Sequence, residues 1–245
     1  MKNSQNQNQV ALITGGSRGI GKALVERFKH EGYSVITCAT ALEHLSDSPA
    51  DLKVACQVQN ITQVKNLIQQ GVSRFGKIDV LVNNAGFAGG NSLETSDSDE
   101  LWHQIIDVNL NGMYYLCKYA APHIADHTGR IINIASVLAL KGVPDQTAYC
   151  AAKHGVLGFT KAFALHLAPR KITVNAVCPG WVRTDMAQGR MKELGLTEEV
   201  LQRSVPLARM IEPSEIADFV YHLSSSAASQ MITGQALTID GGALL

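Results

Sequence analysis

The sequence predicts an α/β protein with one doubly wound parallel sheet of about seven strands and helices on both faces. Short apolar runs alternate with helical patterns along the whole chain, and no linker or change of composition divides it. Hydrophobic residues make up 46% of the 245 residues and charged residues 17%, a composition that can bury a large core. We expect the functional residues at the carboxyl ends of the strands, since these ends meet at one edge of a parallel sheet.

Charge and cysteine content exclude several classes of function. The formal net charge is zero, which disfavours a nucleic-acid partner or an anionic membrane surface. Five cysteines are scattered singly and the histidines lack ligand spacing, so we predict core thiols in a reducing compartment and no metal site. The start lacks the apolar core of a signal peptide, and no later run is long enough to span a bilayer. We therefore expect a cytoplasmic protein.

Residues 1–9 read as a polar, flexible leader and residues 10–245 as a single domain that binds a dinucleotide. Strand 10–14 runs into Thr14-Gly-x-x-x-Gly-x-Gly21, and an amphipathic helix follows to about residue 31. A glycine turn between a strand and a helix is an anion site, because backbone N–H groups and the positive helix end face the ligand. Glycines alone also form plain turns, but this setting favours phosphate binding.

The remaining elements follow the same alternation. We expect further strands at 34–39, 53–58, 78–82, 129–134, 172–178 and 235–240, and helices at 61–75, 99–125, 148–167 and 212–223, with 99–125 as one long helix. The pattern loosens between 181 and 209. A long connection after a strand is often an active-site lid, and we predict one here, with plain surface as the alternative.

Tyr149 and Lys153 lie four residues apart in a predicted helix, so their side chains share one face. A lysine ammonium beside a phenol favours phenolate, which predicts a tyrosine pKa below its ordinary value of about 10. Ser136 follows strand 129–134 and can add a hydroxyl from the sheet. Together the three groups suit proton transfer to or from an alcohol or carbonyl oxygen. Alone, the tyrosine and lysine would be an ordinary helix pair.

The order of these motifs resembles the short-chain dehydrogenases/reductases. The resemblance covers about residue 10 to the end, and implies a Rossmann-type fold and an oxidoreductase with a nicotinamide cofactor. It is carried by Thr14-Gly-x-x-x-Gly-x-Gly21, Asn83-Asn-Ala-Gly86, Asn109, Ser136, Tyr149-x-x-x-Lys153 and Pro179-Gly180-x-x-x-Thr184.

The resemblance implies a role for each matching residue. Tyr149 would be the catalytic acid/base, Ser136 would bind the reacting oxygen, Lys153 would hold the nicotinamide ribose, and Asn109 would anchor a water. Gln57 replaces the acidic residue common near the adenine. The implied cofactor-binding set is Gly15, Ser17, Arg18, Gly19, Ile20, Gly21, Thr40, Gln57, Val58, Asn83, Ala85, Gly86, Tyr149, Lys153, Pro179, Gly180, Val182 and Thr184.

Within the family, the chain most resembles 3-oxoacyl-acyl-carrier-protein reductases and polyketide ketoreductases. This implies reduction of a 3-oxoacyl thioester or related ketone in fatty acid or polyketide metabolism, an acyl carrier protein as a partner, and a homotetramer. Dehydrogenases that act on another alcohol, a sugar or a steroid share these sequence motifs, and such an activity remains the alternative. A dinucleotide-binding regulator without turnover is disfavoured, because all four catalytic positions are kept.

We predict NADP(H) as the preferred cofactor, with NAD(H) as the alternative. Strand 34–39 ends without the carboxylate that would bind ribose hydroxyls and repel a 2′-phosphate. Arg18 in the glycine turn can meet that phosphate with its guanidinium, and Thr40 can donate a hydroxyl.

Overall fold

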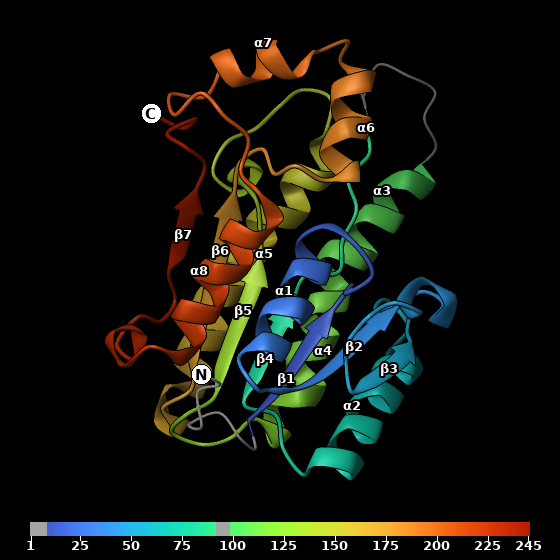
Figure 1. Ribbon diagram of the computed structural model, residues 1–245, viewed down its shortest axis with the longest axis vertical. Helices are drawn as coiled ribbons and strands as arrows, with labels where there is room; N and C mark the ends of the chain where they lie inside the picture. The colour runs from blue at the N-terminus through green and yellow to red at the C-terminus, as the bar shows by residue number, and fades with distance from the viewer. Residues whose placement is uncertain (1–8, 92–98) are drawn as a thin grey trace.

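The computed structural model describes residues 9–91 and 99–245 and contains a seven-stranded parallel sheet of order β3-β2-β1-β4-β5-β6-β7 (Figure 1). The predicted doubly wound sheet is confirmed. Most of the leader, residues 1–8, lies outside the described residues. The strands are β1 (Val10–Thr14), β2 (Ser34–Ala39), β3 (Leu52–Ala55), β4 (Val80–Asn83), β5 (Arg130–Ile134), β6 (Thr173–Pro179) and β7 (Ala236–Ile239).

Helices cover both faces of the sheet. One face carries α1 (Gly19–His30) and α8 (Pro213–Ser225), and the other carries α2 (Ile61–Phe75), α4 (Gly112–Ala120) and α5 (Thr147–Leu167). Helix α3 (Asp99–Ile106) leads into α4. Helices α6 (Asp185–Glu193) and α7 (Glu198–Arg203) lie beyond the carboxyl ends of the strands, at the top of Figure 1. The predicted lid segment therefore lies at the expected edge of the sheet.

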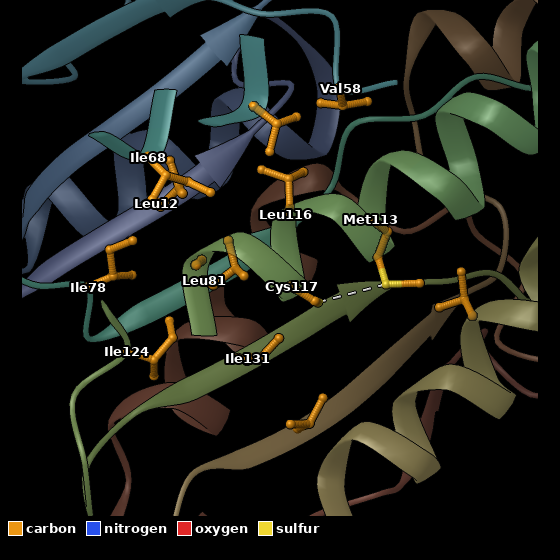
Figure 2. Packing of buried hydrophobic residues seen from close by; sticks show 14 of the residues in the cluster. Leu12, Val58, Ile68, Ile78, Leu81, Met113, Leu116, Cys117, Ile124 and Ile131 are labelled. Carbon is orange, nitrogen blue, oxygen red and sulfur yellow. Dashed lines mark hydrogen bonds between the residues drawn. The ribbon is translucent and has the colours of Figure 1, made fainter. Parts of the chain in front are cut away.

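The core consists of aliphatic side chains between the sheet and the two helical layers. Figure 2 shows Leu12, Leu81 and Ile131 of three neighbouring strands packed against Leu116 of α4. All five cysteines lie in the described chain and are free and buried, as expected of small core residues. Among residues 9–91 and 99–245, no helix is long and apolar enough to cross a membrane, and no His, Cys, Asp and Glu side chains gather as a metal site.

The predicted continuous helix 99–125 is wrong in detail. A π-helical segment, Asp107–Asn111, separates α3 from α4, and Asn109 lies inside it. The Asn109 side-chain amide donates to the Ile105 carbonyl at 3.0 Å, the acceptor that the Asn109 backbone N–H would use in an α-helix. The regular part then ends at Ala120, because Pro122 follows in a 3₁₀ turn.

Several strand limits also differ from the prediction. The third strand ends at Ala55, so Gln57 and Val58 lie in the turn that follows it. The backbone N–H of Gln57 donates to the Gln63 side chain at 2.7 Å, and this bond turns the chain into α2. The fourth strand begins at Val80, two residues late, because Ile78 pairs only as an isolated bridge with Ile124.

A buried polar network joins two central strands to α5. The side-chain amide of Asn83 donates to the Asn133 side-chain carbonyl at 2.8 Å. The amide of Asn133 in turn donates to the Thr160 hydroxyl at 2.9 Å. Asn133 and Thr160 are almost wholly inaccessible to water. The network therefore fixes α5 on the sheet by directional bonds as well as by apolar contact.

Replacing Asn133 with alanine removes both bonds, takes the donor from the buried Thr160 hydroxyl and leaves the buried Asn83 amide with only the Cys117 sulfur as acceptor. We expect the free energy of unfolding to fall by about 2–4 kcal/mol, measured by urea denaturation. Thr160→Val removes one bond only and is expected to cost about half as much. A loss below about 1 kcal/mol for Asn133→Ala would contradict the role given to this network.

Candidate active site

The glycine turn after β1 requires backbone without side chains. Gly15 and Gly19 have φ of +69° and +53°, in the left-handed region. A Cβ on Gly21 would lie 2.0 Å from the Gly15 carbonyl oxygen, so any side chain there would displace the turn. The backbone N–H groups of Gly15 and Gly16 donate to the Cys38 carbonyl at 2.9 and 3.2 Å and hold the turn to the end of β2.

The turn opens directly onto the amino end of α1. Arg18 is the residue before the helix, and its side chain makes no capping hydrogen bond with any described residue. The first turn of α1 holds no acidic side chain to neutralise the positive helix end. Ser17, Gly19 and Ile20 lie in the same stretch. An uncapped helix end with left-handed glycines fits a dinucleotide pyrophosphate.

The Asn83–Gly86 motif is bonded to the glycine turn. The hydroxyl of Thr14 accepts from the backbone N–H of Asn84 at 3.0 Å and of Ala85 at 3.1 Å. The Asn84 amide donates back to the Thr14 carbonyl at 2.9 Å. Asn84 is part of the predicted Asn83–Gly86 motif but not of the predicted cofactor-binding set, and its side chain makes this link. Its polar character at the end of a strand is the only signal for that role in the sequence.

Asn109 faces this motif from the π-helical segment. Its amide donates to the Phe87 carbonyl at 2.9 Å, and a Cβ on Gly86 would lie 2.5 Å from its Oδ1. That oxygen is buried and accepts no hydrogen bond from the described residues. A buried acceptor of this kind suits an ordered water, the role predicted for Asn109.

Ser136, Tyr149 and Lys153 come together where β5 ends against α5. The Ser136 hydroxyl accepts from the Leu138 backbone N–H at 3.1 Å and hydrogen-bonds the Tyr149 phenol. The Lys153 ammonium donates to the Ile134 carbonyl at 2.8 Å and lies 5.5 Å from the centre of the Tyr149 ring. Lys153 is 5% and Tyr149 9% exposed, so both groups lie in a poorly hydrated environment.

The direction predicted for the Tyr149 pKa is wrong. Burial raises the pKa of Tyr149 to about 12, against a smaller lowering by the Ser136 hydrogen bond. Burial also lowers the pKa of Lys153 to about 8. Each group loses hydration of its charged form, and the lysine ammonium donates its hydrogen bond to the Ile134 carbonyl. Tyr149 therefore holds its proton at neutral pH.

The segment after β6 closes on the glycine turn. Pro179 ends the strand, and the Gly180 N–H donates to the Ile239 carbonyl at 2.8 Å. Val182 is buried. Thr184 caps α6 by accepting from the Ala187 N–H, and its methyl group lies 3.1 Å from where a Cβ on Gly19 would be. The chain thus brings this motif beside the glycine turn.

The residues predicted to bind the adenosine end of the cofactor differ in their exposure to solvent. Thr40 and Gln57 are exposed after β2 and β3. Val58 is buried, and its Cγ2 lies 2.7 Å from where a Cβ on Gly112 would be. The Val58 side chain therefore packs against α4.

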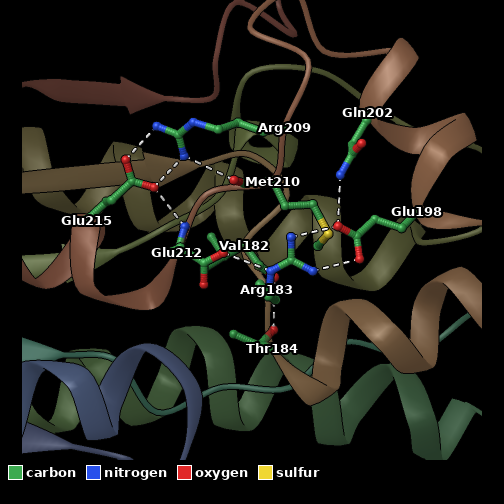
Figure 3. A network of polar contacts seen from close by, with 9 residues as sticks. All are labelled: Val182, Arg183, Thr184, Glu198, Gln202, Arg209, Met210, Glu212 and Glu215. Atoms are coloured by element: carbon green, nitrogen blue, oxygen red, sulfur yellow. Dashed lines mark hydrogen bonds and ion pairs between the residues drawn. The ribbon is translucent and has the colours of Figure 1, made fainter.

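Ion pairs link the segment 181–209, the predicted lid, to itself and to α8 (Figure 3). The Arg183 guanidinium binds both carboxylate oxygens of Glu198 in α7 at 2.6 Å, and its Nε donates to Glu212 at 2.8 Å. Arg209 binds both carboxylate oxygens of Glu215 in α8 in the same way. Arrangements with two parallel bonds are the stronger form of the arginine–carboxylate pair.

The protonated state of Tyr149 can be measured by ultraviolet titration of phenolate. The phenolate absorbance of the wild type minus that of Tyr149→Phe is expected to rise near pH 12, because burial of Tyr149 opposes the phenolate. The native state then binds more protons than the unfolded chain from about pH 10 upwards, so stability falls as pH rises through that range. A difference in absorbance that titrates below pH 10 would show that Lys153 lowers the Tyr149 pKa by more than burial raises it.

Comparison with known proteins agrees with this geometry. A family model described as enoyl-(acyl carrier protein) reductase matches residues 15–243. A 3-oxoacyl-acyl-carrier-protein reductase of Synechocystis is 40% identical over 248 residues, covering 97% of each chain. One from Thermotoga maritima is 38% identical over 248 residues, covering 98% of this chain and 99% of the relative.

Solved structures show the same fold. The ligand-free aldohexose dehydrogenase of Thermoplasma acidophilum superposes with a TM-score of 0.91 at 36% identity, covering 98% of this chain and 96% of that one. A variant of actinorhodin polyketide ketoreductase with NADPH gives a TM-score of 0.89 at 36% identity, covering 96% and 97%. The predicted family and enzyme class are confirmed: the chain belongs to the short-chain dehydrogenases/reductases, a family of oxidoreductases.

Proposed function

We propose that this enzyme uses NADPH to reduce a 3-oxoacyl thioester, or a related ketone, to the secondary alcohol. The observation that carries the proposal is the buried Tyr149 phenol, hydrogen-bonded to Ser136 where β5 ends against α5. A general acid must hold its proton until the substrate oxygen becomes basic, and burial of Tyr149 ensures this. The named relatives include 3-oxoacyl-acyl-carrier-protein reductases and a polyketide ketoreductase with NADPH.

Each residue has a task in the reduction. The amino end of α1, with Gly15, Gly19 and Gly21, holds the pyrophosphate. The bound cofactor supplies the hydride. Ser136 and Tyr149 donate hydrogen bonds to the carbonyl oxygen, and Tyr149 transfers its proton to that oxygen as negative charge develops. Lys153, fixed by the Ile134 carbonyl, keeps a cation near the phenol and binds the ribose.

The 2′-phosphate of NADPH is recognised at the Arg18 side chain. The Arg18 side chain is 78% exposed and its Nη1 lies 3.8 Å from a carboxylate oxygen of Asp185, which is 70% exposed, so the pair contributes little energy. The guanidinium is therefore free to turn to a phosphate, where a charge-assisted bond is stronger. Thr40 is exposed at the end of β2 and can donate its hydroxyl.

The substrate lies between the lid 181–209 and the segment before α5. Arg190 of α6 pairs with the Asp145 carboxylate, which brings the two segments into contact. Met186 and Leu194 are partly exposed on the same lid and give it an apolar surface suited to an acyl chain. An acyl carrier protein presents the thioester at this edge of the sheet.

The enzyme acts as a homotetramer in the cytoplasm. Aromatic rings of α4 and α5 lie in a row: the Tyr114 ring meets the Phe159 ring edge to face with centroids 6.0 Å apart, and the Phe159 and Phe163 rings stack with centroids 5.0 Å apart. Tyr114 is 38% exposed, and such a surface suits contact with a second copy. Five free cysteines suit a reducing compartment.

The reaction is tested by following NADPH absorbance, with NADPH supplied for β-ketoesters, acyl thioesters and a steroid ketone, and NADP+ supplied for an aldohexose. We expect turnover of the β-keto substrates, and a fall in kcat of about 10²-fold or more for Tyr149→Phe, since only the transferable proton is lost. NADPH binding, measured by fluorescence, should be unchanged in that variant. Near-normal activity of Tyr149→Phe, or oxidation of the sugar alone, would contradict the proposal.

Cofactor preference is tested by kcat/KM with NADPH and NADH in the wild type and Arg18→Ala. One charge-assisted contact worth about 1.5–3 kcal/mol gives roughly ten- to hundredfold selectivity for NADPH. Arg18→Ala should lose most of it, whereas Arg27→Ala, on the α8 side of α1, serves as the matched control. Equal wild-type values would refute the preference, and a selective Arg18→Ala enzyme would assign it to another residue.

A further inference from the structure

The helix that carries Tyr149 and Lys153 does not cap its own amino end. Gln146 is the residue before α5, and its side chain makes no capping hydrogen bond within the described chain. The first N–H groups of any α-helix lack partners inside the helix. Ala148, just before Tyr149, is fully buried, so water cannot satisfy its N–H. Another segment must therefore provide the acceptor.

Asn91, from the segment that follows β4, provides it. Its side-chain carbonyl accepts from the Ala148 backbone N–H at 3.0 Å and from the Thr147 hydroxyl at 2.8 Å. Asn91 is 8% exposed, so these bonds are sheltered from water. They lie within two residues of Tyr149 along the helix.

The backbone of Asn91 is fixed at the same place. Its N–H donates to the Asp145 carbonyl at 2.8 Å, and residues 91 and 146 form an isolated parallel bridge. The Asp145 carboxylate pairs with Arg190 of the lid helix α6. Asn91 thus stands where the segment after β4, the lid and the catalytic helix meet.

We propose that Asn91 is a positioning residue for Tyr149, capping the catalytic helix from outside and setting the direction of its first turn. The inference rests on the proposed reduction, in which the phenol must meet the substrate oxygen. Loss of the cap lets this turn tilt or fray, which moves the phenol away from Ser136. The stability of the fold depends on α5 as a whole, whereas the rate depends on its first turn.

Three variants test the proposal. Asn91→Ala removes the acceptor, and Asn91→Asp keeps an acceptor that caps helices as well as asparagine does. Thr147→Val removes one of the two donors without touching Asn91. The matched control is Asn60→Ala, which removes an asparagine cap from α2.

The readout is kcat per NADPH-binding site, with NADPH affinity measured separately. We expect Asn91→Ala to lower kcat about ten- to hundredfold at unchanged NADPH affinity, because small displacements of a catalytic group have effects of this size. Thr147→Val should lower kcat about threefold or more, as expected for one lost bond. Asn91→Asp and Asn60→Ala should both keep kcat within about twofold of the wild type.

A purely structural role would lower the melting temperature of Asn91→Ala but leave kcat per NADPH site unchanged, and this result would overturn the proposal. Equal damage in Asn91→Asp and Asn91→Ala would also overturn it. If Asn91→Ala does not fold, a Thr147→Val variant with wild-type kcat would overturn the proposal instead.

The phenolate titration of Tyr149 provides a readout that needs no turnover. It should shift to lower pH in Asn91→Ala, as the phenol gains water, whereas in Asn91→Asp the added carboxylate opposes phenolate and no shift to lower pH is expected. An unshifted titration in Asn91→Ala would count against the proposal. A wild-type enzyme that reduces no ketone would instead refute the proposed function, and this titration would still decide the role of Asn91.

Discussion

Burial of the first turns of α5 is the constraint on which the site depends. Tyr149 packs with α3 and the segment after β4, Lys153 lies against the end of β5, and both side chains are almost inaccessible to water. Burial holds the phenol neutral and makes the ammonium easier to deprotonate. The polar bonds of Asn133 and Thr160 fix the same helix further along. Position and protonation state thus follow from one packing arrangement.

The fold could be predicted from the sequence because the hydrophobic patterns that define its strands and helices are local. Alternating apolar strands and amphipathic helices predict seven parallel strands, and the structure has them in a doubly wound order. Parallel topology then places Gly15, Asn83, Ser136 and Pro179 at one edge, whatever the loops between them do. This is why motifs scattered over the chain could be assigned to one site.

The features that the sequence did not reveal depend on contacts between distant segments. The raised pKa of Tyr149 follows from burial, which spacing along a helix cannot report. The side chains of Asn84 and Asn91 act by accepting or donating to backbone groups of other elements. The π-helical segment at Asn109 arises where a side-chain amide takes a backbone acceptor. An asparagine in a sequence does not show which of these it will do.

The π-helical segment Asp107–Asn111 has a consequence for how this chain can change over evolution. A π turn fits about one residue more than an α turn into the same rotation, so α3 and α4 face as they would in a regular helix one residue shorter. Deleting one residue there would restore a regular spiral and leave the two halves facing as they do now. Gly112 would keep its place against Val58, whereas the wide turn that brings Asn109 to Gly86 would be lost. The extra residue therefore serves the site rather than the packing of the two helices.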